Sequence, residues 1–238
     1  MNNMINRKVS IEHVPFFSIF ADAVALYDLA ECEGQSHLAS RLAKSSILST
    51  NYALEAAANC FLESLELRSD MKKKIDRFST LEKFDFILQW HTDNNLIKGD
   101  KAFQDINRLV NLRNALVHPK PNIINTEVAS ELLSSESKVS IKHKASESAN
   151  GVLQTFDAND ALRAIRALVH FLNKYVLEWW NVSLEISTAL LVSSWNGSTT
   201  ADNYMYLTDD LEIVLKHESK FRIKFIGIHG ILEQLGER

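Results

Sequence analysis

Residues that interrupt helices are scarce in this chain. Its 238 residues include only 7 glycines and 3 prolines. Glycine weakens a helix by its backbone flexibility, and proline by its missing N–H and its ring. Long segments therefore run without a breaker, and their apolar residues recur every three or four positions, as in an amphipathic helix. This pattern predicts a mainly α protein.

Five segments show the helical spacing. They cover residues 16–30, 37–67, 80–91, 100–117 and 159–180. Because most links between them are short, we expect an up-and-down helical bundle in which consecutive helices lie antiparallel. Ser79 or Thr80 can cap the start of the third segment. Pro119 disfavours helical geometry at His118, so the fourth segment is expected to end there.

Two regions depart from the helical pattern. Residues 119–157 are polar, and residues 138–142 within them alternate like a short strand. Residues 182–238 contain strand-like runs at 204–207 and 221–226, and residues 212–218 suit either a helix or a strand. We therefore expect a bundle over residues 1–181 with a polar insert at about 119–157. A small α/β extension over residues 182–238 is expected to pack on it.

The composition argues against several classes of protein. A net charge of −4 does not suit a general, salt-driven nucleic-acid binder. No apolar run is long enough for a membrane span, and Met1–Ile11 lacks the basic start and apolar middle of a signal peptide. The two cysteines, Cys32 and Cys60, are too few for a disulfide framework and lack metal-ligand spacing. We expect a cytoplasmic protein with no membrane partner.

Positive charge gathers in residues 98–120 despite the negative total. The segment carries +3 and the rest of the chain −7, because five cations (Lys98, Lys101, Arg108, Arg113, Lys120) face two anions (Asp100, Asp105). Two interpretations stay open. The cations form a site for an anion, or they are ordinary surface residues of a solvated helix.

The fourth helical segment ends in the hexamer Arg-Asn-Ala-Leu-Val-His, which Pro119 follows at once. Asn114 and His118 are four residues apart and share a helix face, and the long Arg113 side chain can swing towards it. Imidazole can take a proton from a ribose 2′-hydroxyl or supply one to a leaving oxygen near neutral pH. Guanidinium can hold a phosphate through two hydrogen bonds, and Asn114 can orient the imidazole or bind the substrate. These residue types suit metal-independent RNA cleavage.

The hexamer resembles the R-N-x-x-x-H signature of the HEPN superfamily (higher eukaryotes and prokaryotes nucleotide-binding). The helical segments over roughly residues 16–181 share this resemblance. The catalytic members are metal-independent ribonucleases, often toxins or effectors in bacterial stress response and phage defence. The resemblance implies Arg113 and His118 as catalytic residues with Asn114 assisting, RNA as the substrate and no cofactor. A cognate inhibitor or another partner from the same system would fit such a role.

The resemblance also implies a symmetric homodimer with a composite active site. One motif supplies a single histidine, acid–base cleavage is easiest with two groups, and in the family the cleft lies at such an interface. The segment Ala53–Cys60 is rich in small residues, so another helix can approach it closely. We expect this surface to take part in the dimer contact.

Two further sets of residues are candidates for the site. Glu55 and Asn59 share a helix face, and family members often carry a polar residue on a neighbouring helix that faces the Arg/His pair. The alternative is one solvated stripe with Glu63 and Glu66. Four lysines of the insert are candidates for RNA phosphates, with an ordinary surface loop as the alternative; they are Lys120, Lys138, Lys142 and Lys144.

Other chemistry has little support in the sequence. The chain has no P-loop, no dinucleotide-binding glycine pattern, no H-E-x-x-H and no G-x-S-x-G, and we predict no metal site. Two functions of different classes remain, an endoribonuclease and a non-catalytic helical module that binds a nucleotide or a protein partner. A structural bundle in which His118 only caps a helix is the third alternative.

Overall fold

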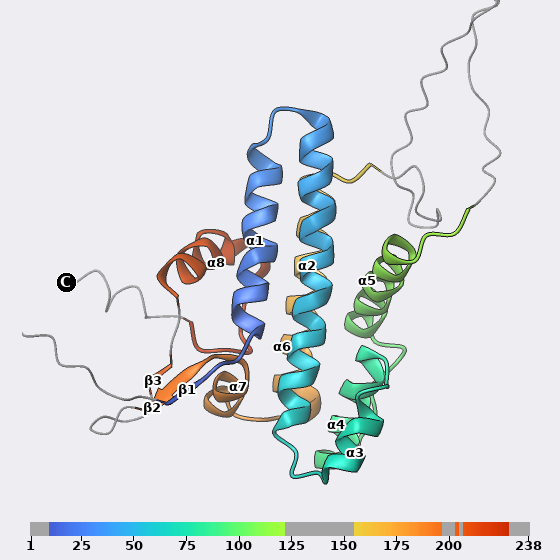
Figure 1. The fold of residues 1–238 in the computed structure, drawn as a ribbon, viewed down its shortest axis with the longest axis vertical. Coiled ribbons are helices and arrows are strands. Elements are labelled where there is room, and N and C mark those ends of the chain that lie inside the picture. Colours follow the sequence, from blue (N-terminus) through green and yellow to red (C-terminus); the bar gives the residue numbers. More distant parts are fainter. Residues whose placement is uncertain (1–9, 122–154, 197–202, 205–206, 229–238) are drawn as a thin grey trace, which may run out of the picture.

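The computed structural model (Figure 1) describes residues 10–121, 155–196, 203–204 and 207–228. Helices dominate these residues. The α-helices are α1 Phe16–Cys32, α2 Ser36–Glu63, α3 Ser69–Ile75, α4 Thr80–Thr92, α5 Lys101–Val117, α6 Ala158–Lys174, α7 Leu184–Leu191 and α8 Thr208–Phe221, and a π-helical segment, η1, covers Tyr175–Trp180. The predicted mainly α fold is confirmed.

The helices α1 and α2 form the centre of the bundle. In Figure 1, α1 and α2 lie side by side as an antiparallel pair, and α6 runs along α2 behind it. α4 and α5 follow one another along the other side of α2, and α8 packs against α1. None of the helices in the described ranges combines the length and the apolarity that a membrane crossing requires.

Aromatic side chains fill the core where α2, α4 and α6 meet. Phe61, Phe84 and Tyr175 are fully buried, and Phe84 and Tyr175 meet edge to face with ring centroids 4.8 Å apart. The Tyr175 hydroxyl donates a hydrogen bond to the Phe84 carbonyl at 2.9 Å. The buried hydroxyl is thus satisfied, so it costs little to place a tyrosine here.

A small sheet joins the beginning of the described chain to its later part. Strand β1 (Ser10–Glu12) pairs antiparallel with β2 (Ser194–Asn196), and β2 pairs with β3 (Asn203–Tyr204). Residues after 182 also share the hydrophobic core with α1 and α6, since Leu191, Val214 and Phe225 are fully buried in the same cluster. The region expected to be an extension is therefore in close contact with the bundle.

Several predicted elements differ in the structure. The second helix ends at Glu63, and the short helix α3, which the sequence did not predict, follows it. Only Ile75 of α3 is buried, so the sequence of this helix shows no repeated apolar positions from which a helix could be predicted. The predicted helix 159–180 is present, but its last six residues adopt the wider π-helical turn of η1. Residues 212–218, which the sequence left open, lie within α8.

The predicted strand at residues 221–226 is wrong. Phe221 ends α8, and the residues after it are irregular. Their apolar residues alternate because this segment lies on the core with one side buried, and its backbone N–H groups bond to side chains. Ile223 donates to Glu218, Lys224 to Asn173 and Gly227 to Thr188.

The alanines of Ala53–Cys60, which were expected at a dimer contact, pack inside the chain. Ala53, Ala57 and Ala58 are fully buried inside the chain, where α2 packs against its neighbours. Small residues let helix backbones approach closely, and here α1 makes that approach. The small-residue surface is therefore already occupied within one molecule.

Candidate active site

The Arg/Asn/His motif lies at the C-terminal end of α5. The Asp100 carboxylate caps the start of this helix by accepting a hydrogen bond from the Ala102 N–H at 2.8 Å. At the other end the His118 N–H donates to the Asn114 carbonyl at 3.0 Å, and His118 itself leaves the helix with φ −120° and ψ 57°. The predicted end of the helix before Pro119 is confirmed.

Arg113 and Asn114 interact directly. The Arg113 guanidinium donates to the Asn114 side-chain carbonyl, with 3.1 Å between Nη1 and Oδ1. Arg113 is half-buried, whereas Asn114 and His118 are exposed. Within the described residues the His118 imidazole makes no hydrogen bond to either of them. The structure thus brings all three side chains to one accessible helix end, with the imidazole free to meet a ligand.

The charge of α5 is uneven along its length. Asp105 pairs with Lys101 at 2.6 Å and lies 3.9 Å from Arg108. Asp100 pairs with Lys174 of α6 at 2.5 Å, and this hydrogen bond holds the pKa of Asp100 below its ordinary value. Both anions of the segment therefore lie in its first half. In the part of the chain that the structure describes, Arg113 and Lys120 have no carboxylate partner, so the end with the motif keeps its positive charge.

The lysines proposed for RNA divide into two groups. Lys120 is exposed two residues after His118. Lys138, Lys142 and Lys144, together with the possible hairpin at 138–142, lie outside the described residues. The candidate phosphate contacts close to the motif are therefore Arg113 and Lys120.

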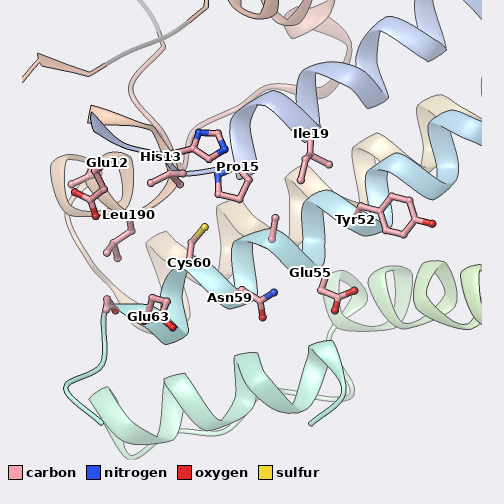
Figure 2. Close-up of a pocket in the computed structure, with 14 residues that line it drawn as sticks. Glu12, His13, Pro15, Ile19, Tyr52, Glu55, Asn59, Cys60, Glu63 and Leu190 are labelled. Carbon is pink, nitrogen blue, oxygen red and sulfur yellow. The ribbon is translucent and has the colours of Figure 1, made fainter. Parts of the chain in front are cut away.

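Glu55 and Asn59 belong to a pocket that contains no residue of the motif. They line a pocket of about 700 Å³ between α2, the start of α1 and α7, and its lining includes neither Arg113 nor His118. Figure 2 shows both side chains on the face of α2 that also carries Glu63. Asn59 is held by α4, because its side-chain carbonyl accepts a hydrogen bond from Lys83 Nζ at 2.7 Å. The common lining with Glu63 agrees with the alternative of a shared polar stripe.

The same pocket contains Cys60. Burial raises the pKa of the Cys60 thiol to about 11, so the thiol stays protonated at neutral pH. The thiolate is the nucleophilic form of cysteine. Cys60 is therefore not suited to nucleophilic chemistry in this pocket.

A cluster of charged residues that the sequence did not indicate joins α1 to α8. Both Asp28 oxygens lie within 2.9 Å of Lys216 Nζ, and the Asp28 carboxylate also meets His217 Nε2 at 2.7 Å. The Glu31 carboxylate accepts hydrogen bonds from Lys220 at 2.8 and 2.9 Å. The i, i+3 spacing on α1 and the i, i+4 spacing on α8 are visible in the sequence, but not that the two helices meet.

This cluster is also the one set of carboxylate and imidazole groups in the described ranges with the spacing of metal ligands. Hydrogen bonds from Lys216 lower the pKa of Asp28, and those from Lys220 lower the pKa of Glu31. Two ammonium groups thus already neutralise the two carboxylates. The cluster therefore acts as an ionic clasp between helices, and a cation would have to displace both lysines.

The chain matches no protein-family model, and comparisons with curated proteins and with solved structures find no similar protein. The motif, its surroundings and the helical bundle are therefore the features of this protein that bear on its function.

Proposed function

We propose that the protein is a metal-independent endoribonuclease of the HEPN type. Arg113 and His118 are its catalytic residues, and Asn114 assists them. The observation that carries this proposal is the position of the three side chains at one accessible end of α5, where Arg113 and Lys120 have no carboxylate partner among the described residues. A polyanion can approach such a surface without first displacing an ion pair.

The chemistry follows from the residue types. The ribose 2′-oxygen attacks the adjacent phosphorus while an imidazole accepts the 2′ proton, and the 5′-oxygen leaves with a proton from a general acid. Arg113 has five N–H donors and uses one for Asn114, so the others can hold the non-bridging phosphate oxygens as charge develops on them. The products are a 2′,3′-cyclic phosphate and a 5′-hydroxyl. No metal ion takes part in these steps.

The proposal includes a homodimer with a composite site. A single motif provides one imidazole, whereas the reaction uses a base and an acid. A two-fold axis near the end of α5 would bring a second His118 to the same phosphate. The pocket lined by Glu55 and Asn59 includes no motif residue, and in this proposal a facing copy completes the cleft around His118.

The decisive experiment is cleavage of total RNA by the purified protein in the presence of EDTA. Arg113→Ala and His118→Ala should each reduce the rate by about 100-fold or more, because each removes a group that acts on the reacting phosphate. Arg108→Ala on the same helix and His170→Ala on α6 are matched controls at exposed positions, and both should retain activity. Full activity in His118→Ala, or inhibition by EDTA, would contradict the proposal.

Action as a toxin or effector in the bacterial cytoplasm is the cellular role that we propose for this activity. Induced expression should then arrest growth, and His118→Ala should not. Growth arrest by both proteins would separate the cellular effect from RNA cleavage.

The second candidate is a non-catalytic module that binds a nucleotide or a protein partner. The exposed position of the motif favours it, since Arg113 and Lys120 can hold a phosphate there without any proton transfer. This function would be supported if a nucleotide copurifies with the wild type but not with Arg113→Ala, and if the wild type does not cleave RNA.

A further inference from the structure

Three aromatic side chains form a row on the outer surface of α4 and the turn before it. We call this row the aromatic ladder; its members are Phe78, Phe86 and Trp90. Phe78 meets Phe86 edge to face at 6.3 Å between ring centroids, and Phe86 meets Trp90 at 5.9 Å. Phe78 is 42% exposed and Trp90 54% exposed. Two large aromatic surfaces thus face the solvent at the ends of one row.

Cations border the aromatic ladder. Residues 68–78 contain five cations, Arg68, Lys72, Lys73, Lys74 and Arg77, against Asp70 and Asp76. Arg68 pairs with Asp70 at 3.0 Å, and Lys72 pairs with Glu63 at 2.5 Å. The remaining three, Lys73, Lys74 and Arg77, are exposed and have no ion-pair partner among the described residues.

The positions of these cations follow from the short helix α3. Ile75 is buried and directs one side of α3 into the protein. Lys73 and Lys74 are exposed, on the side away from it, and Arg77 directly precedes Phe78. Free positive charge therefore stands next to exposed aromatic rings on one continuous stretch of chain.

We infer that this surface binds single-stranded nucleic acid. Unpaired bases stack on exposed aromatic rings, and phosphates pair with neighbouring lysine and arginine side chains. A duplex fits poorly because its bases are already stacked on one another. A second copy of this chain fits poorly too, since a two-fold contact would place Lys73, Lys74 and Arg77 against the same cations of the partner.

As a docking surface for substrate, the aromatic ladder rests on the proposed ribonuclease function. α4 and α5 follow one another along the same side of α2 (Figure 1), so the aromatic ladder and the motif lie on successive helices. α5 has 17 residues, which corresponds to a length of about 25 Å. An RNA strand that reaches both places must therefore span several nucleotides, so very short oligonucleotides should be poor substrates.

Binding can be measured separately from cleavage. The full chain carrying His118→Ala is titrated with fluorescein-labelled single-stranded uridine and adenosine 20-mers and with a 20-base-pair RNA duplex. Phe78→Ala/Trp90→Ala should weaken single-strand binding by about 10-fold or more, because each ring stacks on a base. Ile186→Ala, which truncates an equally exposed apolar residue on α7, is the matched control and should bind as the parent does. Thermal unfolding of each variant checks that the fold is retained.

The charge contribution has its own test. Lys73→Gln/Lys74→Gln should reduce the magnitude of the negative slope of log K against log salt concentration by about 1.4, the loss expected for two phosphate contacts to a single strand. Lys44→Gln/Lys224→Gln removes the same charge from two exposed lysines on α2 and after α8 and should leave the slope unchanged. The inference is overturned if the aromatic variant binds like Ile186→Ala, or if the duplex binds as tightly as the single strands. It is also overturned if the aromatic substitutions only dissociate a dimer. If binding persists but the wild type does not cleave RNA, the ribonuclease proposal alone fails.

Discussion

At the scale of single residues, Lys83 and Asn59 show why a conspicuous polar residue need not be catalytic. Lys83 is 5% exposed, and its ammonium group donates to Asn59 Oδ1 at 2.7 Å. A buried charge without a partner is costly, so Asn59 satisfies a donor that the fold has buried. Its polar character in an alanine-rich helix can be read from the sequence. Its partner cannot, because that depends on where α4 packs.

Asn59→Leu should lower the free energy of unfolding by about 1–3 kcal/mol, because it leaves the Lys83 ammonium without its acceptor. Adding Lys83→Met should restore most of the loss, since two apolar side chains then replace the pair. Urea unfolding measures both effects. Glu55→Gln, on the same helix face, serves as the control and should change stability by less than about 0.5 kcal/mol. Equal losses in the single and double variants would show that the pair is not the cause.

The motif itself was more accessible to sequence reasoning than Asn59. Its placement depends on local rules, namely the helical periodicity of residues 100–117 and the effect of Pro119 on His118. The structure agrees, because α5 ends at Val117 and the three side chains lie at its end. The positions of Glu55 and Asn59 relative to the motif depend on the packing of α2 against α5, which no local rule determines.

At the scale of elements, the ionic clasp joins α8 to α1 over a large sequence distance. It combines Asp28 with Lys216 and His217, and Glu31 with Lys220 and Tyr27. His217 is 3% exposed, and its Nδ1 has no hydrogen-bond partner among the residues that the structure describes. A ring that donates from Nε2 to Asp28 leaves only a lone pair unsatisfied at Nδ1. The clasp therefore fixes the orientation of α8 through polar contacts beside the apolar core.

Acid should weaken the clasp. The pKa values of Asp28 and Glu31 lie below their ordinary values of 3.8 and 4.5, chiefly through hydrogen bonds from Lys216 and Lys220. A lowered pKa in the folded state gives stability that is complete above the ordinary pKa. That stability is lost as the pH falls through the lowered value. At pH 7 the free energy of unfolding of Asp28→Asn/Glu31→Gln should therefore be about 1 kcal/mol below that of the wild type. Between pH 5 and pH 3 it should decrease less than the free energy of unfolding of the wild type does.

Thermal unfolding over this pH range measures the contribution of the clasp to stability. Hydrogen exchange of the α8 amides tests whether the loss of stability affects this helix. Glu12→Gln/Glu66→Gln removes two exposed carboxylates with no ion pair among the described residues, so it should follow the wild type at every pH. Parallel curves for the clasp variant and the wild type would contradict a lowered pKa in the folded protein.

Elements that carry their own local signals were the predictable ones. The capping box of Ser79 and Glu82 begins α4, and apolar residues at every third or fourth position identify α1, α5 and α6. Two others had no such signal. α3 is too short to show a helical period of apolar residues. Apolar and polar residues alternate at 221–226 because one side of the segment is buried, although it pairs with no strand in the described structure. The wide turns of η1 also need knowledge of the packing around Tyr175 and Trp180.

At the scale of the whole molecule, contacts distant in sequence determine how the parts of the chain come together. β1 pairs with β2 across more than 180 residues, with Ile11 opposite Trp195. The core contains residues from α1 to the segment after α8. The sequence indicates the mainly α class through its own periodicity. These pairings follow from the assembled core, and the described residues after 182 share the core of the bundle on which they were expected to pack.

The packing of the whole molecule also determines which surfaces are available for a dimer contact. The alanines of Ala53–Cys60 are buried inside the chain, so they are not available for a contact with a second copy. The end of α5 is the candidate, because Asn114, Val117 and His118 are exposed there and the proposed reaction needs a second imidazole. We predict a symmetric homodimer at micromolar concentration in which two such ends share one cleft.

Val117→Glu should dissociate this dimer, because it places two carboxylates at the two-fold contact, and it should abolish RNA cleavage while the monomer stays folded. Light scattering after size exclusion gives the mass, and the EDTA-containing RNA assay gives the activity. Ile186→Glu introduces the same charge at an exposed residue of α7 and should leave both unchanged. An active wild-type monomer would refute the composite site. A dimer that persists in Val117→Glu would place the contact on another face of the molecule.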